Sequence, residues 1–468
     1  MASAVVQRFI GLGRYLQDPR HVARFQQLCG VRGTFPRKSP GAEEEREPSP
    51  SPNGAFTGPG QGQGAGEQEV KGPRLRKSEN THDSLNGAAA VSGTDTQDGQ
   101  GGPGPAGPSE SSSGLPDGSG ESAGSTGPRG RVKPLRKNSL TGDVGQEFII
   151  ENKFLFYLFT IGTELGNEMF FIVFFPFLMW NVDAYVSRQV ILVWVWVLFF
   201  GQSTKDLVGW TRPASPPVVK VEVFYIFEYS MPSVHAMTGT SVPFCLFLLT
   251  YDRWEYPFLF GLSVAICWSF WVCISRIYMG MHSVLEVIVG FLYSLLIVAA
   301  FHPVLDDIDA FYLSASSAPL VILLLHIGLS LVAFSLDSWS TSRGDTAQAL
   351  ATGAGGALAC HLNHQLGLQP DPPLSSLPLK LPAIDRALLG RSVLRLLVGV
   401  AVLLAVRAVM KAVAIPLACK MFGVPSDDVR KARQNPHVEL TYRFLVYGTV
   451  AFCCVFLVPL LFDHLNLS

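Results

Sequence analysis

The chain has 468 residues, of which 48% are hydrophobic and 16% are charged, and its formal net charge is −1. A near-neutral chain lacks the basic excess with which proteins hold nucleic acid, so we expect no nucleic-acid partner. The mean hydropathy is positive, which argues against a wholly soluble protein and predicts one that is integral to a membrane.

The first part of the chain differs in composition from the rest. Runs such as GPGQGQGAGEQE and GGPGPAGPSESSSG cannot bury enough apolar surface to offset chain entropy. They predict a disordered low-complexity tail over 1–147, followed by a polytopic membrane domain over 148–468. Within the tail, residues 4–28 interleave apolar side chains with arginines, which suits either a basic amphipathic segment on a membrane surface or a short helix without a partner. Ser139, three residues after Arg136, is a candidate site of regulatory phosphorylation.

Long apolar runs dominate the membrane domain. The runs that are long enough to cross a bilayer as helices lie at 154–180, 188–204, 235–251, 256–275, 283–303, 312–334, 392–412 and 441–462. A weaker run at 348–366 is rich in small residues, which suit close helix contacts in lipid. We therefore predict an all-α transmembrane helix bundle with about nine spans, or about eight if the weaker run does not cross.

Cysteine and histidine spacing gives no sign of a metal site. The eight cysteines form no CxxC pair and no Cys/His cluster with the spacing of a zinc site. His361 and His364 are more typical of buried core histidines than of ligands. The sequence therefore predicts neither a metal nor a cofactor.

Polar residues gather at particular helix ends. The second predicted helix ends near Lys205, Arg212 and Pro213, and the third begins near Ser233 and His235. Because successive helices alternate in direction, both ends face the same side as the junction between the fourth and fifth helices. That junction has the sequence SRIYMGMHSVLE.

The junction contains three charged or titratable residues, namely Arg276, His282 and Glu286. Such residues are energetically costly at a membrane boundary unless they have a function there. If the fifth helix begins near Met281, His282 and Glu286 lie one turn apart on one face. The carboxylate can then accept the second imidazole N–H, which fixes the tautomer and leaves the other nitrogen a better nucleophile. The alternative is an ordinary boundary histidine beside an ion pair.

The residue types on this side suit phosphoryl chemistry. Lys205, Arg212 and Arg276 can surround a tetrahedral oxyanion. Ser233 and the free N–H groups of a helix start add neutral donors. One histidine can attack phosphorus while the other protonates the departing alkoxide.

Three motifs in this order, KxxxxxxRP, PSxH and SRxxxxxH, resemble the signature of the lipid phosphate phosphatase superfamily, which also contains glucose-6-phosphatase and vanadium haloperoxidases. Two positions depart from the pattern, because Val234 replaces the usual Gly or Thr and Glu286 replaces a frequent Asp. Segments such as TELGNE, EYSMPSVHAM and DSWSTSRGDTA further resemble the sphingosine-1-phosphate phosphatase family, and this likeness covers nearly all of the chain after residue 135.

The resemblance implies a role for each motif residue. His282 would be the nucleophile that becomes phosphohistidine, Glu286 would orient it, and His235 would be the general acid and then the base. The substrate-binding residues would be Lys205, Arg212, Pro213, Ser233, Ser275 and Arg276. The implied reaction is the metal-independent hydrolysis of sphingoid base 1-phosphates, lipids that lie within the bilayer.

Other functions remain open at this point. They are a broader lipid phosphate monoester phosphatase, a phosphotransferase that uses an alcohol as acceptor, and a non-hydrolytic lipid carrier. The last is suggested by Glu164 and Glu168 inside the first apolar run, which could otherwise bond Lys411 or Arg407 and join the helices. The residues leave the oligomeric state open.

Two arguments disagree on the side that the site faces. Two helices precede Lys205, so the tail and the site share a side, and a count of Lys and Arg places this side in the cytosol. The resemblance instead implies a multi-pass protein of the endoplasmic reticulum membrane with a lumenal site. We expect the lumenal side, because Lys205, Arg212 and Arg276 are needed to bind phosphate and bias the count, and because long tails can translocate regardless of charge.

Overall fold

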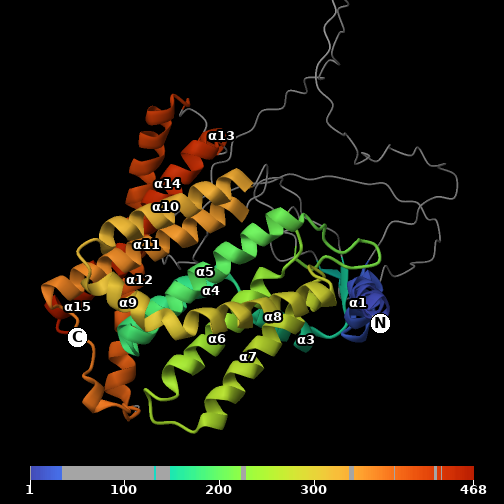
Figure 1. Ribbon diagram of the computed structural model, residues 1–468, viewed down its shortest axis with the longest axis horizontal. Helices are drawn as coiled ribbons and strands as arrows, with labels where there is room; N and C mark the ends of the chain where they lie inside the picture. Colours follow the sequence, from blue (N-terminus) through green and yellow to red (C-terminus); the bar gives the residue numbers. More distant parts are fainter. Residues whose placement is uncertain are drawn as a thin grey trace, which may run out of the picture. The chain divides into compact units, whose positions relative to one another are not determined.

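The computed structural model describes residues 2–33, 131–132, 148–222, 228–336, 342–383, 385–425, 429–433 and 435–467. Most of the described chain is helical, as the apolar runs predict (Figure 1). The low-complexity stretch between 34 and 130 and the candidate phosphorylation site Ser139 lie outside the described residues.

The N-terminal residues differ from the predicted tail. They form helices α1 (Ala2–Gln17) and α2 (Pro19–Leu28) and strand β1 (Val31–Gly33). β1 pairs with β3 (Phe148–Ile150), which also pairs with β2 (Arg131–Val132), in an antiparallel sheet of order β1-β3-β2. The predicted amphipathic segment is thus a pair of helices with partners, because α1 contacts α8 and α2 contacts α7. The average composition of the tail hides these apolar contacts.

Six helical segments of the described chain are long and apolar enough to span a membrane. They are α5 (Ala184–Val208), α7 (Phe258–Tyr278), the segment Val284–Ser314, α10 (Ala318–Leu336), α12 (Arg386–Phe422) and the segment Pro436–His464. The first composite segment contains α8 (Val284–Phe301), η1 (His302–Val304) and α9 (Leu305–Ser314). The second contains α14 (Pro436–Phe452), the π-helical turn η3 (Cys453–Leu457) and α15 (Val458–His464). The chain is therefore a helical, multi-pass membrane protein.

The predicted count of nine spans is not confirmed. The first predicted run is a pair of helices, α3 (Lys153–Glu164) and α4 (Glu168–Asn181), bent by 61°, and α6 (Val234–Thr250) is a shorter apolar helix. α11 (Ser342–Leu366), the weaker run, is less apolar than the six segments because it carries many small and polar residues. It packs against α5, α9, α10 and α14, which suits a helix covered by other helices. The remaining elements are η2 (Leu374–Ser376) and α13 (Val429–Ala432).

The acids of the first predicted run lie at the α3–α4 bend. Glu164 accepts a hydrogen bond from the side chain of Asn167 at 3.1 Å. The side chain of Glu168 is not among those that the structure describes. Arg407 of α12, one of the partners expected for these acids, donates instead to the hydroxyl of Tyr447.

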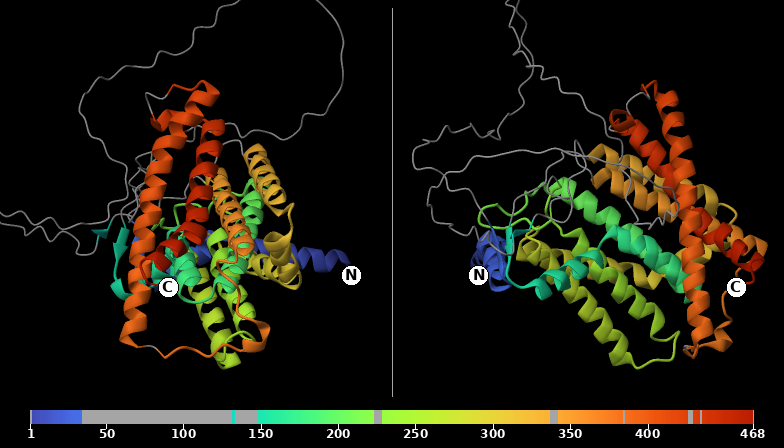
Figure 2. Two further views of the ribbon diagram at one scale, coloured as in Figure 1. Left: turned by 90° about the vertical axis from the view of Figure 1, so that its left-hand side faces the viewer. Right: turned by 180° about the vertical axis from the view of Figure 1, so that it is seen from behind.

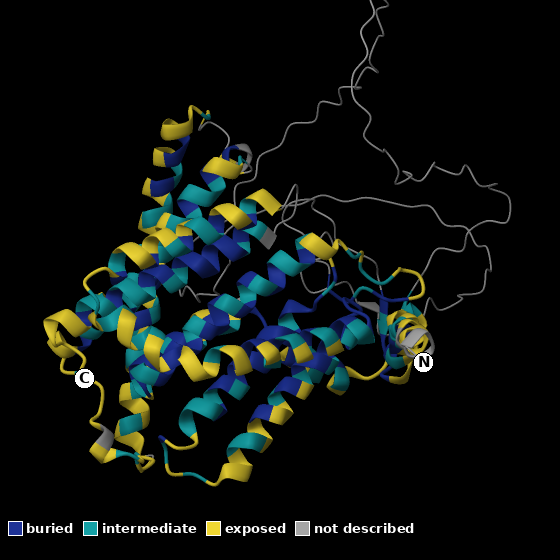
Figure 3. Cartoon of the chain, viewed as in Figure 1, coloured by how far each residue is buried: buried dark blue, intermediate teal, exposed yellow. Residues whose placement is uncertain are grey.

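Burial separates the inner from the outer faces of the bundle (Figure 3). Val193, Trp194, Met237 and Ile297 pack in one core between α5, α6 and α8. Large apolar side chains on the outer faces of α7, α10 and α12 stay exposed, as lipid contact requires. The ends of α5 and α7 and the starts of α6 and α8 lie toward the N-terminal helices (Figures 1 and 2). This end of the bundle carries the motif residues.

Candidate active site

Backbone features bring the motif residues to the ends of their helices. α5 stops at Gly209, which has a φ of +64°, so Lys205 lies in its last turn. Between α7 and α8, Gly280 has a φ of +70°, a conformation that favours glycine. A Cβ at Gly280 would also collide with the carbonyl oxygen of Val219. This tight turn returns the chain so that Arg276 and His282 face the same site.

His282 lies between the carboxylate of Glu286 and the guanidinium group of Arg212. Its Nδ1 is 3.3 Å from Oε2 of Glu286, the one-turn contact that the sequence predicts. Arg212 Nη1 donates to Nε2 of His282 at 3.1 Å. An arginine N–H can only donate, so Nε2 carries the lone pair and the ring proton resides on Nδ1, toward the carboxylate. Burial, followed by the nearby positive charge of Arg212, holds the pKa of His282 well below its usual range, so the ring is neutral near pH 7.

Glu286 is fixed by more than the histidine. It accepts a hydrogen bond from the backbone N–H of Ser283 at 2.9 Å and a short one from the hydroxyl of Ser230. Ser283 in turn caps α8 and completes a capping box with Glu286. Ser230, whose Oγ is 3.4 Å from Nδ1 of His282, was not among the predicted site residues. The carboxylate therefore has a fixed position from which it orients the ring.

The three predicted phosphate-binding cations lie at the same end of the bundle, and each faces a buried carboxylate. Lys205 Nζ is 3.0 Å from Oε2 of Glu228, and Arg212 Nη2 is 3.9 Å from the same oxygen. Arg276 Nη1 is 2.9 Å from Oε2 of Glu222. Sequence reasoning missed both acids, because neither lies in a motif with an assigned role.

Arg276 still has donors to offer. It is 0% exposed, and its Nε and Nη2 atoms have no hydrogen-bond partner within the part of the chain that the structure describes. Buried guanidinium donors without partners are costly, so an anion that fills this position is stabilised by them. Phosphoryl oxygens would satisfy both donors.

The second histidine enters the site from α6. His235 is half-buried in the first turn of α6, and its backbone oxygen lies beside Gly166 of the α3–α4 bend. Thr238 stabilises this contact, because its hydroxyl donates a hydrogen bond to the carbonyl oxygen of Gly166 at 3.1 Å. After burial and the charges of Arg212, Arg276 and Lys205, His235 is a further cause that lowers the pKa of His282, so the two rings lie within electrostatic reach of each other.

The remaining predicted residues have more local contacts. Ser233 is buried and caps α6, and its N–H donates to the carbonyl oxygen of Glu286 at 3.3 Å. Pro213 directly follows Arg212 and has no N–H to offer. Ser275 donates to the carbonyl oxygen of Val272 and accepts from Thr163 at 3.1 Å, which places it at the contact of α3 and α7.

The N-terminal helices also reach the tight turn between α7 and α8, which sequence reasoning missed. The side chain of Gln26 donates to the carbonyl oxygens of Val219 and Tyr278 and accepts from the N–H of Val219, at 2.7, 2.9 and 3.0 Å. Lys220 Nζ donates to the carbonyl oxygen of Gly280 at 2.7 Å. The only signal in the sequence was a polar residue among the apolar positions of segment 4–28.

Comparison with known proteins identifies the family of the chain. Residues 187–309 match the PAP2 superfamily, and this range contains all three motifs. The chain is 47% identical over 466 residues to "Sphingosine-1-phosphate phosphatase 1" of Rattus norvegicus, with 99% of both chains covered. The chain belongs to the sphingosine-1-phosphate phosphatase family. The protein of the same name from Mus musculus is 46% identical over 466 residues, again with 99% of both covered.

A second branch of the sphingosine-1-phosphate phosphatase family is also similar. "Sphingosine-1-phosphate phosphatase 2" of Homo sapiens is 33% identical over 456 residues, which cover 97% of this chain and 98% of that one. No solved structure is detectably similar to the chain. The family is therefore established by sequence, and the site geometry comes from this chain alone.

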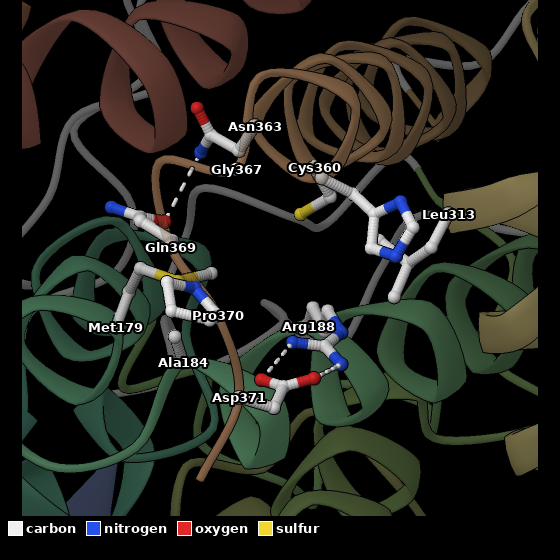
Figure 4. Close-up of a pocket in the computed structure, with 11 residues that line it drawn as sticks. Met179, Ala184, Arg188, Leu313, Cys360, Asn363, Gly367, Gln369, Pro370 and Asp371 are labelled. Carbon is white, nitrogen blue, oxygen red and sulfur yellow. Dashed lines mark hydrogen bonds and ion pairs between the residues drawn. The ribbon is translucent and has the colours of Figure 1, made fainter.

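A further pocket of about 370 Å³ is lined by Arg188, Cys360 and Asp371, among other residues (Figure 4). Its Arg188 bonds the carboxylates of Asp309 and Asp371, at 2.8 and 2.5 Å. Arg188 precedes Lys205 on α5 by a distance on the order of 25 Å along the helix axis, so it lies at the opposite end. Because two carboxylates neutralise this cation, the pocket does not suit an anionic headgroup. Within the described residues, no group of three His, Cys, Asp or Glu side chains could hold a metal ion.

Proposed function

We propose that this protein hydrolyses sphingoid base 1-phosphates, such as sphingosine 1-phosphate and dihydrosphingosine 1-phosphate, through a phosphohistidine on His282. The observation that carries the proposal is the position of His282 between Glu286 and Arg212, with its Nε2 lone pair directed toward cations. The names of the closely similar relatives support the substrate class. Membership of the PAP2 superfamily supports the reaction class, the hydrolysis of phosphate esters.

In the first step, Nε2 of His282 attacks phosphorus as the bond to the lipid oxygen breaks. Lys205, Arg212 and Arg276 stabilise the charge on the phosphoryl oxygens, a part that divalent ions play in other phosphatases. Arg212 is already hydrogen-bonded to the attacking nitrogen, so a phosphate that binds it lies beside Nε2. His235 protonates the departing alkoxide, and the free sphingoid base leaves.

In the second step, His235 accepts a proton from water as the water oxygen attacks phosphorus. The N–P bond breaks, inorganic phosphate is released, and His282 returns to its neutral form. Glu286 stabilises the positive charge that the imidazole carries while it is phosphorylated. The overall reaction is the phosphate monoester plus water, giving the alcohol and phosphate.

The purified protein in detergent micelles tests this function. Phosphate release should be fastest from sphingoid base 1-phosphates in a panel that includes lysophosphatidate and phosphatidate, and chelators should leave the rate unchanged. Equal rates across the panel would favour a broader lipid phosphatase. Transfer of phosphate to an added alcohol would favour a phosphotransferase, and absence of release would favour a carrier.

Glu286→Gln should lower the rate of phosphate release roughly ten- to a hundredfold, a scale borrowed from groups that orient metal ligands. The amide cannot accept from His282, Ser230 and Ser283 as the carboxylate does, and it does not stabilise the imidazolium. Glu286→Asp keeps the charge and should lose less activity than Glu286→Gln. Equal rates for Glu286→Gln and the parent would show that the carboxylate has only a local structural role.

The pH dependence should carry a contribution from Lys220. Burial, followed by the charge of Arg212, lowers the pKa of Lys220 to about 7. Lys220 is charged below this pH and loses its proton above it, so a positive charge near the phosphate site disappears as the pH rises. We expect kcat/KM, which reports the free enzyme, to fall on the alkaline side of this value.

Lys220→Arg is the matched variant, because arginine stays protonated throughout this pH range. Its kcat/KM profile should keep its value to a higher pH than that of the parent. Profiles that superimpose would show that the charge of Lys220 does not reach the substrate.

We further propose that all nine predicted runs cross the membrane and that the site faces the lumen of the endoplasmic reticulum. Each run corresponds to a helix or a bent helix pair, with α6 and α11 covered by their neighbours. An epitope before α1, probed by protease after selective permeabilisation of the plasma membrane, should be protected. Cleavage with the lumen sealed would contradict the lumenal placement. A lumenal site would also keep cytosolic kinases from Ser139.

A further inference from the structure

A carboxylate lies among the cations that are proposed to hold the phosphate. Glu228 is buried, and its Oε2 is 3.0 Å from Nζ of Lys205 and 3.9 Å from Nη2 of Arg212. Its backbone oxygen also accepts from Nε of Arg212 at 3.1 Å. The side chain of Glu228 therefore faces both cations, and its main chain faces Arg212.

Such an acid opposes the binding of phosphate. A phosphate monoester carries about −1.5 to −2 charges at pH 7, so it repels a carboxylate and competes with it for Lys205 and Arg212. The repulsion is strong where water is excluded. An acid in this position favours only those phosphates that bring a positive charge with them.

Sphingoid base 1-phosphates bring that charge. Their ammonium group is on the carbon atom next to the one that carries the phosphate ester. A carboxylate that borders the phosphate is therefore within ion-pairing reach of the ammonium. Lysophosphatidate has a hydroxyl group in that position, and N-acylated sphingoid base phosphates have a neutral amide.

We propose that Glu228 binds the ammonium group of the substrate, once the phosphate has taken over Lys205 and Arg212, and thereby selects sphingoid base phosphates. The inference rests on the proposed function and names the residue that sets its substrate class. Arg212 contacts both the attacking Nε2 of His282 and the carboxylate of Glu228, so one guanidinium group separates Glu228 from the attacking nitrogen. After the exchange every charge still has an opposite partner, because the phosphate replaces the carboxylate beside Lys205 and Arg212 and the ammonium replaces these cations beside the carboxylate.

Glu222 provides the contrast. It is buried, precedes Glu228 in the same connection between α5 and α6, and pairs with Arg276. Arg276 has two further buried nitrogens without partners among the described residues, so it can bind phosphate and keep Glu222. Glu222 therefore stays paired when substrate binds, and Glu222→Gln is a matched control for Glu228→Gln.

The experiment compares dihydrosphingosine 1-phosphate with its N-acetyl derivative, which has the same chain but no charge on nitrogen. The parent should prefer the amine-bearing substrate. In Glu228→Gln, the ratio of the two kcat/KM values should fall on the order of tenfold or more, because the amide no longer selects a cation. Lysophosphatidate should follow the N-acetyl compound. Glu222→Gln should change all rates together and preserve the ratio.

Glu228→Asp provides a second measurement in case the Gln variant folds poorly. It keeps the negative charge, so it should retain more of the preference than Glu228→Gln does. A parental ratio in both Glu228 variants would overturn the inference and leave the proposed function intact. A parent that releases phosphate from none of the substrates would instead overturn the proposed function.

Discussion

His282→Ala should abolish phosphate release, with a loss on the order of 10⁶-fold, the scale seen when the covalent nucleophile of a hydrolase is removed. Nε2 of His282 is the neutral nitrogen that faces the cations, and no other described side chain is held between Glu286 and Arg212 in this way. The acid-labile phosphoenzyme should disappear with the activity. Rapid denaturation after brief exposure to ³²P-labelled substrate measures both.

His235→Ala separates the two histidines. This variant should be slow with sphingoid base phosphates, because the alkoxide leaves without a proton. It should still form the phosphoenzyme from p-nitrophenyl phosphate, whose leaving group needs no protonation. Near-normal activity in His282→Ala, or loss of the parent's activity with chelators, would refute the assignment of the nucleophile.

Arg276→Lys should lower kcat on the order of 10²- to 10³-fold, the scale found for the loss of a donor to a charged transition state. Lysine keeps the charge that pairs with Glu222 but lacks the planar fork that offers Nε and Nη2 to the phosphoryl oxygens. Inhibition by orthovanadate, which mimics the transferred phosphoryl group, should weaken in parallel. The rates and inhibition constants come from the same micellar assay.

Arg188→Lys is the matched control for this change. Arg188 is also an arginine that faces carboxylates, with a side chain that is 13% exposed, but it lies at the other end of α5. The substitution should lower the thermal stability and leave kcat per folded molecule unchanged. Equal losses of kcat in both variants would mean that Arg276 acts only through the packing of the bundle.

The helices were predictable because a bilayer imposes a simple rule, namely about 20 apolar residues for each span. The runs at 188–204 and 256–275 correspond to α5 and α7 on that basis. The convergence of the motifs followed from the alternating direction of successive helices. The α1–α2 pair was not predictable in the same way, because it is stabilised by residues far away in the sequence, such as Val218 beside Val22.

The candidate site was predictable in its residue types but not in its pairings. The one-turn spacing of His282 and Glu286 placed them together, since helix geometry is local. Glu222, Glu228 and Ser230 lie in a connection without periodicity, so no pattern indicated their partners. From sequence alone, a loop carboxylate is expected to be solvent-exposed, because only the fold shows which cation it contacts.

The pairing of both β1 and β2 with β3 has a consequence for the long segment between Gly33 and Arg131. Because both ends are fixed in one sheet, that segment is an insertion rather than a free end, and its entropic cost grows only slowly with its length. Cleavage within it would yield two polypeptides that remain associated through the sheet and the Gln26 hydrogen bonds. The gene could therefore be split there, and the two co-expressed pieces would reconstitute the enzyme.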